Sequence, residues 1–396
     1  MIKPVTVIIG LLLSASAAVA QTIYPIDRAE ILSGAQFDFK VEFPDKVDPA
    51  KLKVTVNGQD YAAAFGRAGT FVEREDDKDQ SALLLRDVAI TAPGPVVVEA
   101  GDGTRSRKVT WTVYDTPPRK AKNVILFIGD GMSLSHRVAA RLLSKGIAEG
   151  KTFGKLAMDD MPHMALVATA GSDSIITDSA NSASAYSTGH KSAVNAMGVY
   201  ADRTANPLDD PKVETIASLA KRRLNMAIGI VTNTEIEDAT PAAMVAHTRR
   251  RAEYDPIVEQ LFAAKPDVML GGGSANFLPK ASSGSKRKDD VDYIARFREA
   301  GYAVAATAGE LNALSAKPDT RLLLGLFAPG NMDGALDPQI PQGRRREEIP
   351  RAARPDRTGP GRPERSVAER CRLLPDGGIR NDRQIRAPAR HGARRL

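Results

Sequence analysis

Three short clusters of polar residues combine the side chains that phosphate and metal chemistry uses. The first is a carboxylate between two glycines, Asp130 in the run F-I-G-D-G-M at residues 127–132. The apolar run before it is typical of a buried strand, and open α/β sheets bind ligands where such strands end. The glycines let a ligand or metal approach the backbone. A carboxylate that only caps the next helix fits this position equally well. A dinucleotide site is disfavoured because a third glycine is absent.

The second cluster places a hydroxyl at the head of a stretch of small residues. Ser179 lies in the run T-D-S-A-N-S-A at residues 177–183. Free N–H groups and the helix dipole at such a point favour an anion such as phosphate. An ordinary N-cap serine is the alternative. The chain has no G-x-S-x-G elbow and no evident base beside Ser179, so a nucleophilic serine here would need a metal to activate it.

The third cluster runs from Glu237 to Arg251. Asp238 and Thr240 are two residues apart and carry the hard oxygen atoms that Mg²⁺ prefers. Pro241 suits a first helical turn, so Thr240 could also be only an N-cap. About three helical turns further on, Arg251 could present a guanidinium fork to a phosphate. The alternative is that it belongs to a solvated face with the two arginines before it.

Together these clusters resemble the alkaline phosphatase family over about Asn123 to Asp337. The motifs F-I-G-D-G-M, T-D-S-A-N-S-A-S-A-Y-S-T-G, D-A-T-P-A-A-M-V-A-H-T-R-R-R and L-G-G-G occur in the family's order. The resemblance implies hydrolysis of phosphate monoesters through a phosphoserine intermediate, with two Zn²⁺ and one Mg²⁺.

The resemblance also implies a role for each site residue. Ser179 corresponds to the nucleophile and Arg251 to the phosphate clamp. Asp130 corresponds to a ligand shared between one zinc ion and the magnesium, and Asp238 and Thr240 to the magnesium sphere. In this chemistry one zinc ion lowers the pKa of the serine hydroxyl, and the other polarises the leaving oxygen.

The family's remaining ligands are expected after Asp337, and this chain does not carry them there. They comprise a glutamate for magnesium, an aspartate and two histidines for one zinc, and an aspartate–histidine pair for the other. The only histidine after His247 is His391. Shifted by one nucleotide, residues 374–396 are compatible with a sequence containing E-x-G-x-I-D-x-x-x-H. We therefore predict a frameshift near Asp337 and little or no activity for the chain as written.

The charge distribution agrees with this interpretation. Residues 342–396 hold 16 arginines, no lysine and 7 acidic residues, a net charge of +9, which leaves −2 for the rest of a chain whose net charge is +7. The basic tail is thus no sign of a nucleic-acid partner. A single cysteine excludes a disulfide scaffold. No apolar run after residue 20 reaches the ~18 residues of a membrane helix, so we expect no stable membrane insertion.

The sequence divides into five regions. Residues 1–20 resemble a secretory signal, which predicts export, most simply to a bacterial periplasm; a buried N-terminal helix is the alternative. Residues 21–115 alternate in polarity at 37–41, 52–56, 95–99 and 109–113, with an Asn57-Gly58 turn, which indicates a small immunoglobulin-like β-sandwich. Residues 116–121 form a linker, residues 122–337 an α/β domain, and residues 338–396 an Arg- and Pro-rich disordered tail.

The α/β domain is predicted to be a doubly wound, alkaline-phosphatase-like sheet that is incomplete at its C-terminus. Its expected strands are residues 124–128, 227–231 and 267–270, and its expected helices are residues 134–145, 213–223 and 257–264.

Two other functions remain open from the sequence. A phosphodiesterase of the same superfamily would use related residues, whereas a sulfatase is disfavoured because Cys371 does not begin a C-x-P-x-R motif. A non-enzymatic protein could instead hold a polyanion or a surface through the β region and the tail. We expect small phosphate monoesters as the molecules that this protein binds, and no nucleic acid. A homodimer is possible for an intact member of the family.

Overall fold

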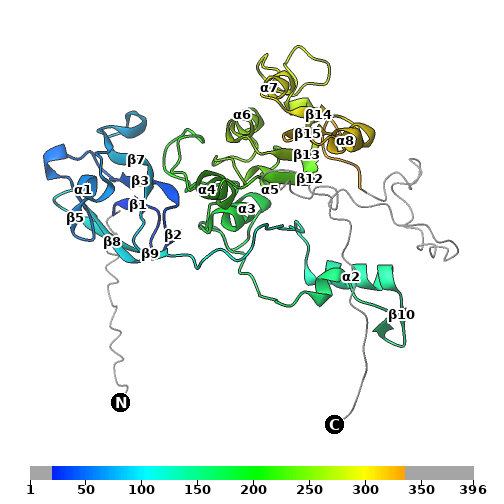
Figure 1. Ribbon diagram of the computed structural model, residues 1–396. Coiled ribbons are helices and arrows are strands. Elements are labelled where there is room, and N and C mark those ends of the chain that lie inside the picture. Colours follow the sequence, from blue (N-terminus) through cyan, green and yellow to red (C-terminus); the bar gives the residue numbers. More distant parts are fainter. Residues whose placement is uncertain (1–19, 335–396) are drawn as a thin grey trace, which may run out of the picture. The chain divides into compact units, whose positions relative to one another are not determined.

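The computed structural model describes residues 20–334, and the predicted tail and nearly all of the predicted signal segment lie outside them (Figure 1). Its strands are β1 (Thr22–Tyr24), β2 (Glu30–Leu32), β3 (Gln36–Glu42), β4 (Lys53–Val56), β5 (Gln59–Asp60), β6 (Thr70–Val72), β7 (Ala82–Ala89), β8 (Gly94–Gly101), β9 (Ser106–Tyr114), β10 (Ile147–Ala148), β11 (Lys151–Thr152), β12 (Gly229–Glu235), β13 (Val268–Gly272), β14 (Ala303–Ala305) and β15 (Leu323–Leu326). Its α-helices are α1 (Tyr61–Phe65), α2 (Leu134–Lys145), α3 (Ser179–Thr188), α4 (Ile216–Leu224), α5 (Ala239–Ala242), α6 (Tyr254–Ala264), α7 (Tyr293–Glu299) and α8 (Ala308–Ser315). Short 3₁₀ helices are η1 (Pro49–Lys51), η2 (Glu75–Asp77), η3 (Ala157–Asp160) and η4 (Ser274–Asn276).

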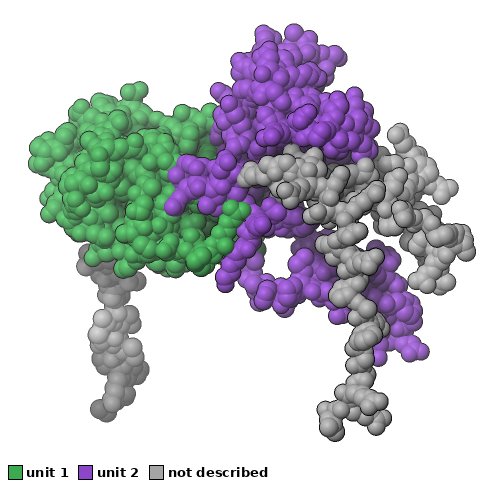
Figure 2. All heavy atoms as spheres, viewed as in Figure 1, with its two compact units in different colours: residues 1–119, 169–219, 247–251 green, residues 120–168, 220–246, 252–396 purple. Residues whose placement is uncertain are grey.

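The chain divides into two compact units, coloured separately in Figure 2. Unit 1 comprises residues 1–119, 169–219 and 247–251, and unit 2 comprises residues 120–168, 220–246 and 252–396. The N-terminal strands therefore belong to the same unit as α3 and Arg251. The five-region division expected from the sequence stays a prediction.

The N-terminal strands of unit 1 form two sheets over one core. One sheet has the order β1-β3-β7-β6 and the other β2-β9-β8-β4-β5. The core takes Phe37 and Phe39 from the first sheet and Trp111 from the second, and both phenylalanines meet the indole edge-on. The predicted strands at 37–41, 52–56, 95–99 and 109–113 are confirmed as parts of β3, β4, β8 and β9. The immunoglobulin-like topology remains a prediction.

Residues 197–214 connect these strands to the rest of unit 1. Phe37 forms an antiparallel bridge with Val213, on the same edge of β3 along which β1 pairs with residues 40–42. Val199 bridges Lys212, and Met197 bridges Thr248. Backbone hydrogen bonds thus run from the N-terminal sheet to the segment that carries Arg251.

A buried set of charged side chains reinforces the same connection. Lys40 of β3 is 3% exposed, and its Nζ lies 2.6 Å from both Glu75 Oε1 and Asp202 Oδ2. Asp202 N donates to Oδ1 of Asp210, and Nη1 of Arg249 lies 3.2 Å from that same oxygen. Because a buried charge without a partner is costly, these groups hold one another in a fixed arrangement.

Unit 2 contains a four-stranded parallel sheet with the order β12-β13-β15-β14. Helix α8 contributes Leu311 to a small core with Leu270 of β13 and Leu323 of β15. The predicted helix at 134–145 is confirmed with its ends. The predicted strands at 227–231 and 267–270 and the predicted helices at 213–223 and 257–264 are confirmed with ends shifted by a few residues.

The predicted buried strand at residues 124–128 is wrong. This segment has no strand geometry, and its side chains are exposed, with Phe127 at 76% and Val124 at 73%. A strand of this kind needs hydrogen-bond partners along its edges and layers over its faces. Among residues 20–334 no strand pairs with it, so the apolar pattern is present without the neighbours that would make it a strand.

Trp111 offers a direct test of the shared core. It is fully buried, and its Nε1 donates to Pro25 O at 2.9 Å. Trp111→Ala should lower the free energy of unfolding by about 3–5 kcal/mol, as truncation of a buried aromatic does. Thr110→Ala, an exposed neighbour on β9, should change it by less than about 1 kcal/mol. Chemical denaturation followed by circular dichroism measures both, and equal effects would contradict the packing described.

Asp210 predicts how stability depends on pH. Burial raises its pKa to about 7, against the opposing effect of Arg249. Near pH 5 to 7 the folded chain therefore binds a proton that the unfolded chain, with an aspartate pKa of about 3.9, does not. The Asp210 contribution to the free energy of unfolding falls as pH rises through this range.

Asp210→Asn removes this titration. Relative to the parent chain, the variant should gain about 1–3 kcal/mol in free energy of unfolding between pH 5 and pH 8. Denaturation at both pH values, followed by the fluorescence of Trp111, gives the difference. A variant whose relative stability is constant or falls with pH contradicts the prediction.

Candidate active site

Ser179 lies at the first position of α3 in unit 1. The N-cap of this helix is Asp178, whose carboxylate accepts a hydrogen bond from Asn181 N at 3.0 Å. The alternative of Ser179 as an N-cap is therefore wrong, and its hydroxyl does not serve the helix end. The side chain is half-buried. Its oxygen sits where the helix dipole favours negative charge.

Arg251 reaches the same point from a distant part of unit 1. Its Nη1 lies 2.7 Å from Ser179 Oγ, to which it donates, and 3.4 Å from Asp178 Oδ2. The guanidinium side chain is 28% exposed, so the alternative of a solvated face is wrong. The hydroxyl therefore faces both a guanidinium and a helix N-terminus. Both favour an anion at this position.

The route by which Arg251 arrives differs from the prediction. Arg251 was expected about three helical turns beyond Pro241, but α5 ends at Ala242. The residues beyond it turn and pair with residues 195–197 instead: Thr248 N donates to Met197 O, and Arg251 N donates to Asn195 O at 2.9 Å. Tertiary pairing thus replaces the helix.

Unit 2 brings together Asp130 and Thr240, which are 110 residues apart in sequence. Thr240 Oγ1 donates to Asp130 Oδ2 at 2.8 Å. Neither residue is a helix cap, because Ser133 caps α2 and Asp238 caps α5. Both capping alternatives are therefore wrong for Asp130 and Thr240. Asp238 takes that capping role, its carboxylate accepting from Ala239 N at 2.7 Å.

The donor set in unit 2 fits one of the implied metals and not the others. Asp130 and Thr240 are in contact, and Asp238 lies two residues before Thr240 in the sequence. All three carry hard oxygen donors, the kind that Mg²⁺ takes together with water. Within residues 20–334, no group of three or more His, Cys, Asp or Glu side chains could hold a metal ion. A zinc site needs three or four such ligands, so the described part of the chain does not fit the zinc pair.

Glu237 is a buried carboxylate that the sequence did not single out. It is fully buried beside Asp238, and burial raises its pKa to about 8. The amide of Asn276 donates to its Oε1, while Oε2 has no hydrogen-bond partner among the described residues. A Cβ at Gly273 would lie 2.3 Å from Oε2, so this glycine of the L-G-G-G motif is required by close approach. The L-G-G-G motif was therefore the sequence signal that could have pointed to a buried side chain packed against Gly273.

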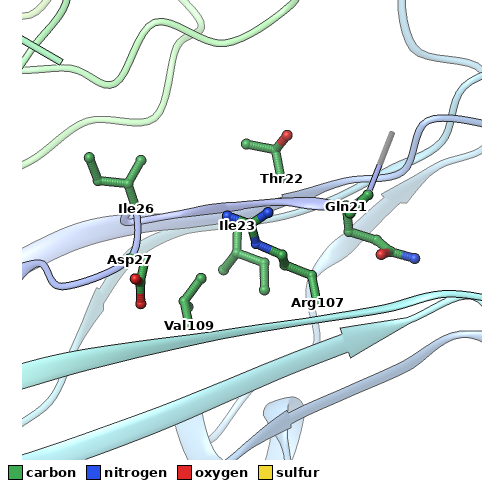
Figure 3. Close-up of a pocket in the computed structure, with 8 residues that line it drawn as sticks. Gln21, Thr22, Ile23, Ile26, Asp27, Arg107 and Val109 are labelled. Atoms are coloured by element: carbon green, nitrogen blue, oxygen red, sulfur yellow. The ribbon is translucent and has the colours of Figure 1, made fainter. Parts of the chain in front are cut away.

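A hollow of about 290 Å³ lies between β1 and β9 and contains none of these residues (Figure 3). It is lined by Ala20, Gln21, Thr22, Ile23, Ile26, Asp27, Arg107 and Val109. Its charged lining residues are Asp27 and Arg107, and no residue of the three motif clusters lines it. The candidate chemistry therefore rests on the Ser179 and Asp130 clusters. None of the helices formed by residues 20–334 has the length and apolar character required to cross a membrane.

The comparisons with known proteins agree with these motifs. Residues 121–342 match the family model described as alkaline phosphatase. The alkaline phosphatase of Escherichia coli (strain K12) is 37% identical over 268 residues, covering 61% of this chain and 53% of the relative. The streptomycin-6-phosphate phosphatase of Streptomyces griseus is 37% identical over 235 residues, covering 54% of this chain and 49% of the relative.

A solved structure, the alkaline phosphatase from the Antarctic bacterium TAB5, has a TM-score of 0.42 and 26% sequence identity, covering 50% of this chain and 51% of that one. The chain spans about half the length of the curated relatives it matches. The match to the family model nevertheless covers more than half of this chain, and the chain belongs to the alkaline phosphatase family.

Proposed function

We propose that the frame-restored form of this protein hydrolyses phosphate monoesters, with Ser179 as the nucleophile and Arg251 as the phosphate ligand, and that the chain as written keeps both residues without turning over substrate. The observation that carries the proposal is the 2.7 Å contact between Arg251 Nη1 and Ser179 Oγ at the start of α3. A phosphate monoester brings negative charge to a point where a guanidinium and a helix N-terminus both favour it. The small phosphate monoesters expected from the sequence are the proposed substrates, and residues 1–20 are the proposed export signal.

The chain's own residues supply positioning and charge. Ser179 Oγ would attack phosphorus as the bond to the leaving oxygen breaks, and the serine proton would pass to that oxygen, which departs as the free alcohol. Water would then attack the phosphoserine, which releases inorganic phosphate and restores the serine hydroxyl. Arg251 would donate to the non-bridging oxygens, whose charge is spread in the transition state. Since a guanidinium is a donor only, Arg251 stabilises a serine oxyanion but does not take the serine proton.

Asp130, Asp238 and Thr240 would hold a magnesium ion in unit 2. When bound, such an ion supplies Lewis-acid charge and lowers the pKa of a bound water. Thr240 Oγ1 fixes one oxygen of Asp130, and the cap bond fixes Asp238, so two of the three donors have set orientations. No step is assigned to zinc, because the described residues do not fit it.

We also propose the frameshift near Asp337 as the reason why the remaining family ligands are absent. On this account the chain as written keeps the nucleophile, the phosphate ligand and part of a magnesium site. Resequencing the DNA around the codon for Asp337 checks the frame directly and provides the frame-restored gene.

Phosphate binding tests Arg251 without requiring turnover. Inorganic phosphate should raise the melting temperature of the full chain, because a ligand that binds only the folded state stabilises it. Arg251→Met should weaken this binding about tenfold or more, since a charged hydrogen bond contributes about 1.5–3 kcal/mol. Arg250→Met, whose side chain is exposed, is the matched control. Equal phosphate affinity in both variants would contradict the assignment.

Turnover tests Ser179. With p-nitrophenyl phosphate, Mg²⁺ and Zn²⁺, the chain as written should show no more hydrolysis than its Ser179→Ala variant. The frame-restored protein should hydrolyse the ester, and Ser179→Ala should reduce its kcat by at least about a thousandfold, as loss of a nucleophile does. Turnover by the chain as written that Ser179→Ala abolishes would overturn the predicted inactivity. A fully active frame-restored Ser179→Ala variant would overturn the nucleophile.

A further inference from the structure

We propose that the N-terminal β strands position Arg251 for phosphate, with Lys40 and Arg249 as positioning residues. The inference rests on the proposed function, since it assumes that Arg251 binds phosphate. It gives a role to residues 21–115, which precede the segment matched by the alkaline phosphatase model. These strands belong to the same compact unit as Ser179 and Arg251.

The first connection is a series of backbone hydrogen bonds that begins at β3. Asp38 N donates to Lys212 O at 2.8 Å, and Lys212 N donates to Oδ2 of Asp38 at 3.0 Å. Val213 N then donates to Gly198 O at 2.8 Å. A register shift in the β3–β7 pairing falls at Asp38. This residue therefore departs from the regular ladder at the point where the segment containing Lys212 and Val213 bonds to β3.

The second half of the series ends at the active-site pair. Met197 and Thr248 exchange backbone hydrogen bonds of 2.8 and 3.0 Å, and Arg251 N donates to Asn195 O. Gly198 N also donates to Ser184 Oγ at 3.0 Å, which ties the same segment to α3. Residues 195–198 are therefore bonded both to the backbone of Arg251 and to the side chain of Ser184 on α3, the helix that begins at Ser179. The same residues are bonded to the N-terminal sheet through 211–213.

The second connection is made by side chains. Lys40 Nζ bonds the carboxylate of Asp202, and Arg249 donates to the carbonyl oxygens of Asp202 and Thr204 at 2.8 and 2.7 Å. Arg249 N donates to Pro207 O. A planar guanidinium can satisfy two carbonyls at once, whereas an ammonium at this position can not reproduce the fork. Lys40 thus acts on Arg251 through Asp202 and Arg249, two residues before it.

The three consecutive arginines have three different environments. Arg249 is held by the loop of residues 202–210, Arg250 is exposed, and Arg251 bonds Ser179. Only the third has its guanidinium directed to the nucleophile. Arg249 is thus a positioning residue, and Arg250 provides a control of the same charge at the adjacent position.

Hydrogen exchange with inorganic phosphate as the probe tests the inference on the full chain. The variants are Lys40→Met, Arg249→Lys, Arg249→Met and the control Arg250→Met. Exchange at residues 195–200 and 248–251 should become at least about tenfold faster in Lys40→Met and Arg249→Lys, while residues 184–188 of α3 keep their rates. The phosphate concentration for half-maximal protection at 179–182 should rise about tenfold in both. Arg249→Met should weaken phosphate binding more than Arg249→Lys does, because the lysine keeps the positive charge and can still donate a hydrogen bond.

The outcomes separate the inference from the proposed function. Accelerated exchange confined to those segments, together with weaker phosphate protection, supports positioning. Unchanged exchange, or faster exchange with unchanged phosphate affinity, overturns it. If Lys40→Met fails to fold, the Arg249 pair of variants decides the question by the same criteria. Phosphate that fails to protect residues 179–182 of the parent chain overturns the proposed function, and the positioning role with it, whatever the exchange rates of the variants.

Discussion

The hydrogen bond between Arg251 and Ser179 is the interaction on which the account of this protein depends. Its two partners are 72 residues apart, and the helix α5, which was expected to continue toward the arginine, ends at Ala242. A guanidinium held 2.7 Å from a hydroxyl at a helix N-terminus creates a small region of positive potential around the oxygen that we propose as the nucleophile. Phosphate is the ligand class that such a region favours.

Holding a charged side chain in that position requires a rigid backbone on both sides. The described structure provides this through residues 195–214, which pair with β3 on one side and with Thr248 on the other. Lys40, Asp202 and Arg249 add charges that are mostly buried, and the carboxyl of Asp210 contacts two of these residues. Buried ion pairs contribute little net stability, but they disfavour alternative arrangements in which one partner is left alone. In this protein the buried ion pairs therefore act mainly by holding the backbone around Arg251 in one arrangement.

The sequence was sufficient wherever a local pattern determines the structure. Alternating polarity at 37–41 and 109–113 predicted strands because each has one face in a core with Phe39 and Trp111. The helix at 134–145 was predicted with the ends that the structure has, since its N-cap Ser133 and the following Gly146 mark them.

The sequence was insufficient where structure depends on distant partners. Residues 124–128 have the composition of a buried strand, but a strand exists only with neighbours beside it. The contact of Thr240 with Asp130 and that of Arg251 with Ser179 join segments 110 and 72 residues apart, and single-sequence patterns carry no information about such pairs. The motifs nevertheless singled out the residues that the structure brings into contact, because a family resemblance preserves side-chain identity even where the local structure was predicted wrongly. Their roles in the site remain predictions.

A crystal structure of the full chain with inorganic phosphate bound tests the central claim most directly. The account predicts a phosphate whose oxygens accept from the guanidinium of Arg251 and whose phosphorus faces Ser179 Oγ at the start of α3. A phosphate bound elsewhere on the folded chain, with Arg251 and Ser179 making no contact to it, would contradict the account.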